Sequence, residues 1–460
     1  MAAAAALSLT APAGANAAGL PVFTKGPINH VLVIDMENES ESTWYKSSSM
    51  PYTNSVLLQQ GEFITNYYAT SHVSLGNYIS QVSGQEPTFA ANNDCINLAT
   101  LTNPPVVGAF NTVTPGTDDP NPTAYPGQVD GDGCVYPAPT ATTHGAQTIG
   151  DQLDAFYGSS GMNRNKIYWR EYAEDMGLDN LRDHGSPDPN DTGNDCAHPV
   201  VGGNDLTNTA EATDQYADRH NPFLYFHSVI DNDARCIKHV VPLGTALVDP
   251  VTPSNDVFIG HLHDDLMAIR TTPKFMFVTP NLCNDGHDAT CHGKNIEGGS
   301  TGGLVAADLW LKHYMPMIFA SQAYQNGSLM VVVTFDEGGS TDSTACPNSD
   351  QSTCGSPVGP NVSNPGFSYL LSLFRVQTTP TQNYVYPGGG QVGAIVFNKR
   401  YVMPATVNTT GVYNHYSALR TYEDLLGVNT GGDDGQGHLG YASGVNVVPF
   451  GTDVFNMNTH

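Results

Sequence analysis

The sequence predicts an α/β fold, in the form of a three-layer α/β/α sandwich with a largely parallel central sheet. Short apolar runs rich in β-branched and aromatic residues recur along the chain, as in strands that are covered on both faces. Stretches with apolar residues at helical spacing lie between these runs, and this alternation is typical of parallel sheets flanked by helices. With 460 residues, 40 % of them hydrophobic, the chain can bury a large core. We expect one large domain over residues 18–460.

Six apolar runs are predicted as strands, and they cover residues 30–35, 63–67, 166–169, 223–226, 275–278 and 329–335. Helices are predicted over residues 148–157, 208–219, 261–270, 304–322 and 416–426. Two stretches interrupt the alternation. Residues near 95–145 are rich in Pro, Thr, Gly and Asp, and residues near 340–392 are rich in Gly, Pro and Ser, so both are predicted as long surface insertions.

Residues 1–17 are predicted to be a cleaved secretory signal. The first residues are small, apolar and uncharged, and Ala15-Asn16-Ala17 matches the small-residue pattern of a cleavage site. No Lys or Arg precedes this apolar stretch, as one usually does in a signal, so a flexible Ala-rich tail is the alternative. With a signal, the protein is expected to be secreted or periplasmic.

The eight cysteines are predicted to form disulfides, because an exported compartment is oxidising. The pairing is open from the sequence alone. Nearest neighbours would pair as Cys95–Cys134, Cys196–Cys236, Cys283–Cys291 and Cys346–Cys354. No C-x-x-C motif is present, which leaves a thiolate zinc site with little support.

The strongly negative net charge of the chain restricts the classes of partner that it can bind. Asp and Glu number 44 against 17 Lys and Arg, which gives a net charge of −27. So acidic a chain is not expected to bind nucleic acid or an anionic membrane through a basic surface. No apolar run approaches the length of a membrane span, so no integral membrane segment is predicted. The oligomeric state is not indicated.

Acid and amide groups follow three of the predicted strands. Ligands of open α/β sheets bind beyond the carboxyl ends of the strands, so these groups are expected to gather in one crevice. Buried neighbouring carboxylates need a compensating cation, and a divalent metal supplies it. Oxygen ligands favour Mg, Mn or Ca, and nearby His leaves Zn or Fe open. The alternative is a set of solvated turns. The groups are Glu37 and Asn38 after the first strand, Asp285, His287 and Asp288 after another, and Asp336 and Glu337 after the last.

Ser74 is a candidate nucleophile. Leu75, Tyr78, Ile79 and Val82 have helical spacing, which predicts a helix that begins at Ser74 and ends at Gly84. Ser74 would then be either a helix N-cap or a hydroxyl placed where backbone N–H groups bind phosphate. Neither a G-x-S-x-G elbow nor a P-loop motif is present, which disfavours an α/β-hydrolase and a P-loop NTPase.

Six ordered blocks carry a resemblance to a known family. They are HVLVIDMEN from residue 30, SHVSLGNYISQVSG from residue 71, NPFLYF from residue 221, DGHD from residue 285, VTFDEGG from residue 333 and NHYSALRTYEDLL from residue 414. In this order they resemble the bacterial and fungal phosphoesterase family of secreted acid phosphatases and phospholipases C, within the alkaline phosphatase superfamily. The resemblance spans about residues 28–445.

The resemblance implies roles for individual residues. It makes Ser74 the nucleophile and His287 a proton donor or phosphate contact. His415 is expected to be structural. The implied metal ligands are Glu37, Asn38, Ser74, Asp336 and Glu337. Substrate contacts are expected from His72, Asn77, His144, Asp285 and Asp288, of which the last two could instead hold a second metal.

The function that the resemblance implies is a secreted, metal-dependent acid phosphatase that hydrolyses small phosphate monoesters through a phosphoserine. A phospholipase C-type phosphodiesterase with the same site, acting on a phospholipid, is the first alternative. A non-catalytic exported protein that binds a metal or ligand is the alternative of another class. No Cys-x-Pro-x-Arg block is present, which disfavours a sulfatase.

Overall fold

A computed structural model describes residues 27–88, 90–95, 108–115, 125, 127–141, 143–158, 166–177, 184–187, 194–205, 212, 215–339, 360–361 and 388–456. The predicted signal, the pair Cys346 and Cys354, and most of the predicted insertion near 340–392 lie outside these residues. No helix in the described part of the chain is long and apolar enough to cross a membrane.

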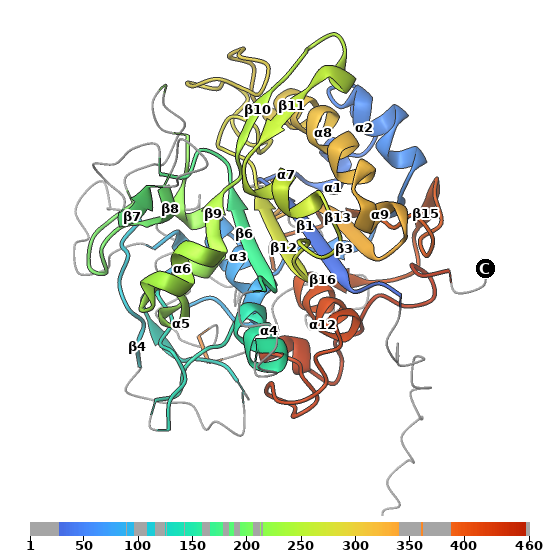
Figure 1. Ribbon diagram of the computed structural model, residues 1–460. Coiled ribbons are helices and arrows are strands. Elements are labelled where there is room, and N and C mark those ends of the chain that lie inside the picture. The colour runs from blue at the N-terminus through green and yellow to red at the C-terminus, as the bar shows by residue number, and fades with distance from the viewer. Residues whose placement is uncertain are drawn as a thin grey trace, which may run out of the picture.

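The centre of the fold is an eight-stranded sheet in the order β15-β2-β14-β13-β1-β12-β6-β9 (Figure 1). Strand β1 lies between β13 and β12 and is parallel to both. Strand β14 is antiparallel to both of its neighbours, so it runs against the other strands of this sheet. The strands are β1 (His30–Met36), β2 (Glu62–Ile64), β6 (Trp169–Ala173), β9 (Val240–Pro242), β12 (Phe275–Thr279), β13 (Leu329–Phe335), β14 (Ala394–Phe397) and β15 (Thr406–Asn408).

Helices cover both faces of the sheet, which confirms the predicted three-layer α/β fold (Figure 1). One face carries α3 (Ser74–Ser83), α4 (Ile149–Gly158) and α12 (His415–Leu426). The other carries α2 (Pro51–Ser55), α7 (His261–Leu266), α8 (Gly303–Ala320) and α9 (Gln322–Gln325). Shorter helices are α1 (Glu41–Trp44), α5 (His227–Ile230) and α6 (Asp233–His239). Short two-stranded sheets pair β3 (Tyr67–Tyr68) with β16 (Tyr413–Asn414), β4 (Thr114–Pro115) with β5 (Gly131–Asp132), β7 (His184–Pro187) with β8 (Asn194–His198), and β10 (Thr245–Leu247) with β11 (Val257–Ile259).

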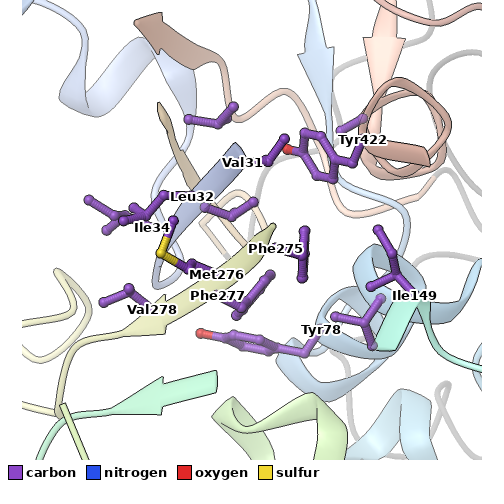
Figure 2. Packing of buried hydrophobic residues seen from close by; sticks show 14 of the residues in the cluster. Val31, Leu32, Ile34, Tyr78, Ile149, Phe275, Met276, Phe277, Val278 and Tyr422 are labelled. Carbon is purple, nitrogen blue, oxygen red and sulfur yellow. The ribbon is translucent and has the colours of Figure 1, made fainter. Parts of the chain in front are cut away.

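Successive side chains of each central strand point to opposite faces of the sheet, so apolar side chains reach both helical layers. On β12, Phe277 meets Tyr78 of α3 edge-on with ring centroids 6.2 Å apart, and Phe275 lies 5.8 Å from Tyr422 of α12 (Figure 2). Met276 and Val278 point to the opposite face, where they lie beside Leu32 and Ile34 of β1 (Figure 2). Because successive side chains of a strand alternate between faces, one short apolar run supplies both halves of the core.

Several predicted elements differ in the structure. Residues 223–226 are not a strand: they belong largely to the 3₁₀ helix Pro222–Tyr225, whose aromatic side chains pack into the core. The helix predicted over 208–219 is absent from its described residues 215–217, and a 3₁₀ turn, Asp218–His220, follows. The strand predicted over 166–169 begins only at its last residue. The helix predicted over 261–270 ends at Leu266, because Thr271 and Thr272 hydroxyls bind the carbonyl groups of the last turn. For residues 223–226 core packing, and for residues 261–270 side-chain hydrogen bonds, override the local propensity.

Three of the predicted disulfides are present, namely Cys95–Cys134, Cys196–Cys236 and Cys283–Cys291. The first joins the residues after α3 to the described part of the predicted insertion near 95–145, which also holds β4 and β5. Nearest-neighbour pairing is thus confirmed for six of the eight cysteines.

The buried carboxyl of Glu62, the first residue of β2, leads to a prediction about the pH dependence of stability. Burial, and then the charge of Asp453, raise the pKa of its carboxyl from 4.5 to about 7. The folded state therefore keeps a proton that the unfolded chain has lost, and stability falls as pH rises from about 4.5 through about 7. We expect Glu62→Gln to raise the free energy of unfolding by about 1–2 kcal/mol at pH 8, after allowance for partial solvent screening. At pH 5 the gain should nearly vanish. Thermal unfolding at both pH values measures this, and equal gains at both would contradict it.

Candidate active site

The carboxyl ends of β1 and β13 meet through backbone hydrogen bonds at one edge of the sheet. The amide of Asp336, which follows β13, donates to the Met36 carbonyl at the end of β1 (2.8 Å). The amide of Glu37 donates to the Asp285 carbonyl (2.8 Å), and the amide of Asn38 donates to Asp336 Oδ1 (2.8 Å). These bonds bring three segments that are far apart in the sequence together at the edge where ligands of α/β sheets bind.

Ser74 lies at the same place, at the first position of α3. The residue before the helix is Val73, in an extended conformation, so Ser74 does not act as the N-cap. Its hydroxyl instead donates to Glu37 Oε2 (2.9 Å), and the Asn38 side-chain amide donates to the same oxygen (2.6 Å). The helix ends at Gly84, as predicted, which has φ +68° and approaches the Leu439 carbonyl too closely for a side chain. The Ser74 side chain therefore faces the carboxylates rather than the backbone of its own helix.

The loop before α3 is held by residues of the helix itself. Asn77 Oδ1 accepts hydrogen bonds from the backbone amides of Thr70 (2.9 Å) and Ser71 (2.8 Å), and its amide group donates to the Ser71 carbonyl (2.9 Å). A Cβ on Gly76 would lie 2.5 Å from Ser71 Oγ, so only glycine allows this close approach. The expected substrate contact of Asn77 does not fit this arrangement, because its polar atoms are occupied by the loop. It positions Ser74 instead.

Burial raises the pKa values of the carboxyl groups in this cluster. For Glu37 the cause is burial first, and then the charges of Asp336 and Asp285. For Asp336 burial is again the largest cause, followed by Glu337. Burial raises the pKa of Asp285 to about 7. Asp285 Oδ2 and Asp336 Oδ2 are buried without a hydrogen-bond partner among the described residues, which is costly for carboxylate oxygens unless a cation is near.

Two histidines support the acidic pair after β13. His72 Nδ1 lies 2.5 Å from Glu337 Oε2, so Glu337 faces this imidazole rather than Ser74. His415, which is fully buried, donates from Nε2 to the Asp336 carbonyl (2.7 Å), and its Nδ1 accepts from the Tyr67 hydroxyl (3.1 Å). Burial lowers the pKa of His415 to about 4, which keeps it neutral and fixes this tautomer. Both ring nitrogens of His415 are thus occupied by neighbouring groups of the fold.

Three charged or polar groups near Glu37 were not predicted from the sequence. The Tyr78 hydroxyl donates to Glu37 Oε1 (2.9 Å), and His220 Nε2 lies 3.1 Å from the same oxygen. His220 stacks on Tyr78, and burial holds its pKa well below the usual range. Arg219 lies 3.7 Å from Asp94, whose Oδ1 accepts from the Leu75 amide (3.2 Å) at the start of α3. The only sequence signal for Arg219 and His220 was their position directly before the NPFLYF block.

Three further residues predicted for the site, His287, Asp288 and His144, lie outside the buried group of carboxylates around Ser74. The His287 amide donates to Asp285 Oδ1 (3.0 Å), its side chain is 53 % exposed, and Nδ1 lies 3.7 Å from Asp288 Oδ1. His287 and Asp288 thus lie toward solvent beside the buried group. His144 is exposed and lies near Asp433, whose pKa burial raises and His144 offsets only in part. Asp433 contacts Gly440, which packs against Gly84 at the far end of α3, so the structure does not bring His144 to Ser74.

A divalent cation suits this donor set. Glu37, Asp336 and Asp285 supply carboxylates, Asn38 an amide oxygen and Ser74 a hydroxyl, all hard oxygen ligands. In the part of the chain that the structure describes, the only three His, Cys, Asp or Glu ligand atoms within 4.8 Å of one another belong to Cys196, His198 and Cys236. Two of these form a disulfide, so their sulfurs are not thiolate ligands. The carboxylates of Glu37 and Asp336 are instead linked by Asn38, whose backbone amide donates to Asp336 and whose side chain donates to Glu37.

A polar cavity of about 210 Å³ adjoins the cluster. It lies beyond the ends of β6 and β12, and Asn284 in its wall directly precedes Asp285. The Glu174 carboxylate accepts from the Asn281 amide (2.9 Å) and from the Asn284 side chain (3.0 Å). Burial raises the pKa of Glu174 to about 8. Carboxyl and amide groups in such a wall suit a ligand with several hydroxyl groups.

Comparison with solved structures finds only distant likeness. A member of the alkaline phosphatase superfamily from Vibrio parahaemolyticus has 10 % identity and a TM-score of 0.41, over 89 % of this chain and 68 % of that one. A sulfatase, PsFucS1 from Pseudoalteromonas sp., has 11 % identity and a TM-score of 0.39, over 88 % and 68 %. No family model matches the chain.

Curated relatives are closer in sequence. A phosphate-repressible acid phosphatase from Penicillium chrysogenum is 23 % identical over 308 residues, which cover 67 % of this chain and 48 % of the relative. A probable acid phosphatase from Kluyveromyces lactis is 24 % identical over 301 residues, or 65 % and 45 %. The chain thus spans about half the length of the relatives it matches. It is similar to fungal proteins named acid phosphatases, as the resemblance of its sequence blocks implied.

Proposed function

We propose that this protein is a metal-dependent phosphoesterase, secreted or periplasmic, that hydrolyses phosphate monoesters through a phosphoserine on Ser74. The observation that carries the proposal is the position of the Ser74 hydroxyl. It lies at the start of α3 and donates to Glu37 Oε2 (2.9 Å), within a cluster of buried carboxylates. Similarity to proteins named acid phosphatases supports the choice of reaction.

The divalent cation would be held by Glu37, Asn38, Asp336 and Ser74, with Asp285 beside them. When bound, such an ion lowers the pKa of a serine hydroxyl and offsets the charge of phosphoryl oxygens. Glu337 is oriented toward His72, so we assign it to the positioning of that imidazole beside the ligands.

The chain's own residues would carry the chemistry around Ser74. Its Oγ attacks phosphorus in line with the leaving oxygen and forms the phosphoserine, and water then cleaves it. The hydrogen bond from Ser74 Oγ points the departing proton toward Glu37 Oε2. Phosphoryl oxygens would face the first turn of α3, where backbone N–H groups favour anions, and the positive charge of Arg219. His287, which is exposed beside Asp288, would give a proton to the leaving alcohol.

The polar cavity beside Asn284 would receive the leaving group. Its walls of carboxyl and amide groups suit a polar alcohol such as a polyol, which favours soluble monoesters over a phospholipid.

Hydrolysis of p-nitrophenyl phosphate beside p-nitrophenyl phosphorylcholine, from pH 4 to 9 and with a panel of divalent metals, tests the proposal. We expect turnover of the monoester that depends on added metal and exceeds turnover of the diester at least about tenfold. Both substrates release p-nitrophenol, but the diester also carries a choline group that stays on phosphorus, and misfit of such a group costs about 1–3 kcal/mol. Preference for the diester would favour a phospholipase C. Metal binding without turnover of either substrate would favour a non-catalytic binding protein.

A further inference from the structure

A second hollow, of about 750 Å³, lies at the amino ends of the central strands, whereas the candidate active site lies at their carboxyl ends. Its wall contains His30, the first residue of β1, and Lys274, which directly precedes β12. Lys166 lies in the segment that leads into β6. Since β1 spans seven residues, the hollow is about 20 Å from Glu37, which follows the other end of that strand. The two sites are therefore separate.

The hollow is basic in a chain that is strongly acidic. Lys and Arg number 17 against 44 Asp and Glu, yet Lys166, Arg270 and Lys274 line this one hollow, and no acid belongs to its wall among the residues that the structure describes. Among the described residues, none of the three forms an ion pair. The other polar groups in the wall are Asn29, His30 and Gln322. The wall thus offers N–H donors from three cations and two amides, and no carboxylate competes for them.

The two lysine amines are held in place by aromatic rings rather than by acids. Lys274 Nζ lies 4.4 Å from the ring centroid of Tyr157, and Lys166 Nζ lies 6.0 Å from that of Tyr168. The two rings stack on each other with centroids 5.4 Å apart, and the Tyr168 hydroxyl donates to the Tyr157 carbonyl (3.2 Å). Cation–π contacts fix an ammonium group and leave its charge available to a ligand. The stacked rings of Tyr157 and Tyr168 therefore hold the two ammonium groups in place without neutralising their charge.

The cations also act on one another. Burial, and then Lys166, lower the pKa of Lys274 to about 8. His30, whose Nδ1 bonds the Pro273 carbonyl (2.8 Å), has its pKa lowered to about 4 by burial and further by both lysines. An anion in the hollow would relieve this repulsion and raise the pKa values of Lys274 and His30.

We infer that this hollow is a binding site for a small polyphosphate anion, such as a diphosphate. Three neighbouring cations match an anion that carries several charges, and the volume exceeds what one phosphate group needs. Lys and Arg are the side chains that bind phosphate oxygens best, and Arg adds a planar pair of donors. The inference does not depend on the chemistry at Ser74, because the site lies at the opposite edge of the sheet.

Calorimetric titration of the full chain with methylene diphosphonate, which is not hydrolysed, tests the site. We expect wild type to bind, and Lys166→Met/Lys274→Met to lose at least about tenfold in affinity for this binding event, since the variant lacks two charge-assisted hydrogen bonds to the anion. Lys46→Met/Lys312→Met changes the net charge equally and should bind as wild type does. Lys166→Arg/Lys274→Arg should retain binding, which separates lost charge from lost packing.

A second measurement needs no substitution. Lysines carrying ¹³C-methyl groups report their own titration by NMR, and we expect the pKa of Lys274 to rise by about one unit or more when diphosphonate is added, as for an ammonium that gains an anionic partner. Binding that is equal in wild type and Lys166→Met/Lys274→Met overturns the inference. So does a Lys274 titration that diphosphonate leaves unchanged. An equal loss in Lys46→Met/Lys312→Met would show a general charge effect and overturn it as well.

Discussion

Ser74→Ala is expected to reduce phosphomonoester turnover by at least about 10³-fold, because it removes the atom that forms the covalent intermediate and leaves only binding and electrostatic contributions. The fold should persist, since Ser74 does not cap α3. Glu37, Asn38 and Asp336 remain in the variant to hold the metal. The rate with p-nitrophenyl phosphate measures the loss. Acid quenching with ³²P-labelled substrate should trap a phosphoprotein in wild type and none in the variant.

Ser83→Ala is the matched control for this substitution. Ser83 lies in the same helix, is equally buried, and its hydroxyl donates to the Ile79 carbonyl (2.7 Å) away from the carboxylates. The control should retain nearly full activity. A Ser74→Ala enzyme that keeps more than a few per cent of the wild-type rate would show that another group attacks phosphorus.

Asp336→Asn should abolish the response of the protein to divalent cations. Addition of the preferred ion at about 100 times its Kd stabilises a folded protein by about 2.7 kcal/mol, which appears as a rise in Tm. Asn keeps the shape of Asp336 and can still accept from the Asn38 and Glu337 amides, but it removes the negative charge beside Ser74. We expect the rise in Tm to vanish in the variant, and turnover to fall at least about 10²-fold.

Without metal, the same variant should be no less stable than wild type at pH 8. Burial, and then Glu337, raise the pKa of the Asp336 carboxyl, so the folded state resists its ionisation. A raised folded-state pKa means that stability is lost as pH rises above the unfolded value, and Asn removes this loss. Asp308→Asn is the control: Asp308 is also buried and accepts from the Tyr52 and Thr53 amides, so it should leave the cation response intact. An undiminished cation response in Asp336→Asn would place the ion elsewhere.

The elements that the sequence predicted well are those whose signals are local. The runs at 30–35, 275–278 and 329–335 are continuous apolar segments, and all three are central strands. The bounds of α3 follow from helical spacing and from a glycine at its end that takes a left-handed conformation. Acid groups directly after two of these strands could also be predicted to meet, because parallel strands present their carboxyl ends at one edge.

The run at 223–226 shows where local signals fail. Its aromatic residues are as apolar as those of a strand, but they form a 3₁₀ helix whose rings pack on Trp169 and other core residues. Burial was predictable from composition, whereas the conformation depended on which surface the rings had to fill. The same holds for Asn77, whose type suits a phosphate contact and whose actual partners are two backbone amides of its own loop.

The sequence by itself determined the layered α/β fold and placed Ser74 at the start of a helix and acid groups at strand ends, since periodicity and strand ends are properties of short segments. The cysteine pairing stayed open until the structure showed three disulfides between nearest neighbours. Tertiary structure alone decided that His220 and Tyr78 share Glu37, that His144 lies at the far end of α3, and that two lysines face one hollow. These groups come from segments that meet only when the sheet closes and helices pack on it. Burial, which sets their charge states, exists only after that packing.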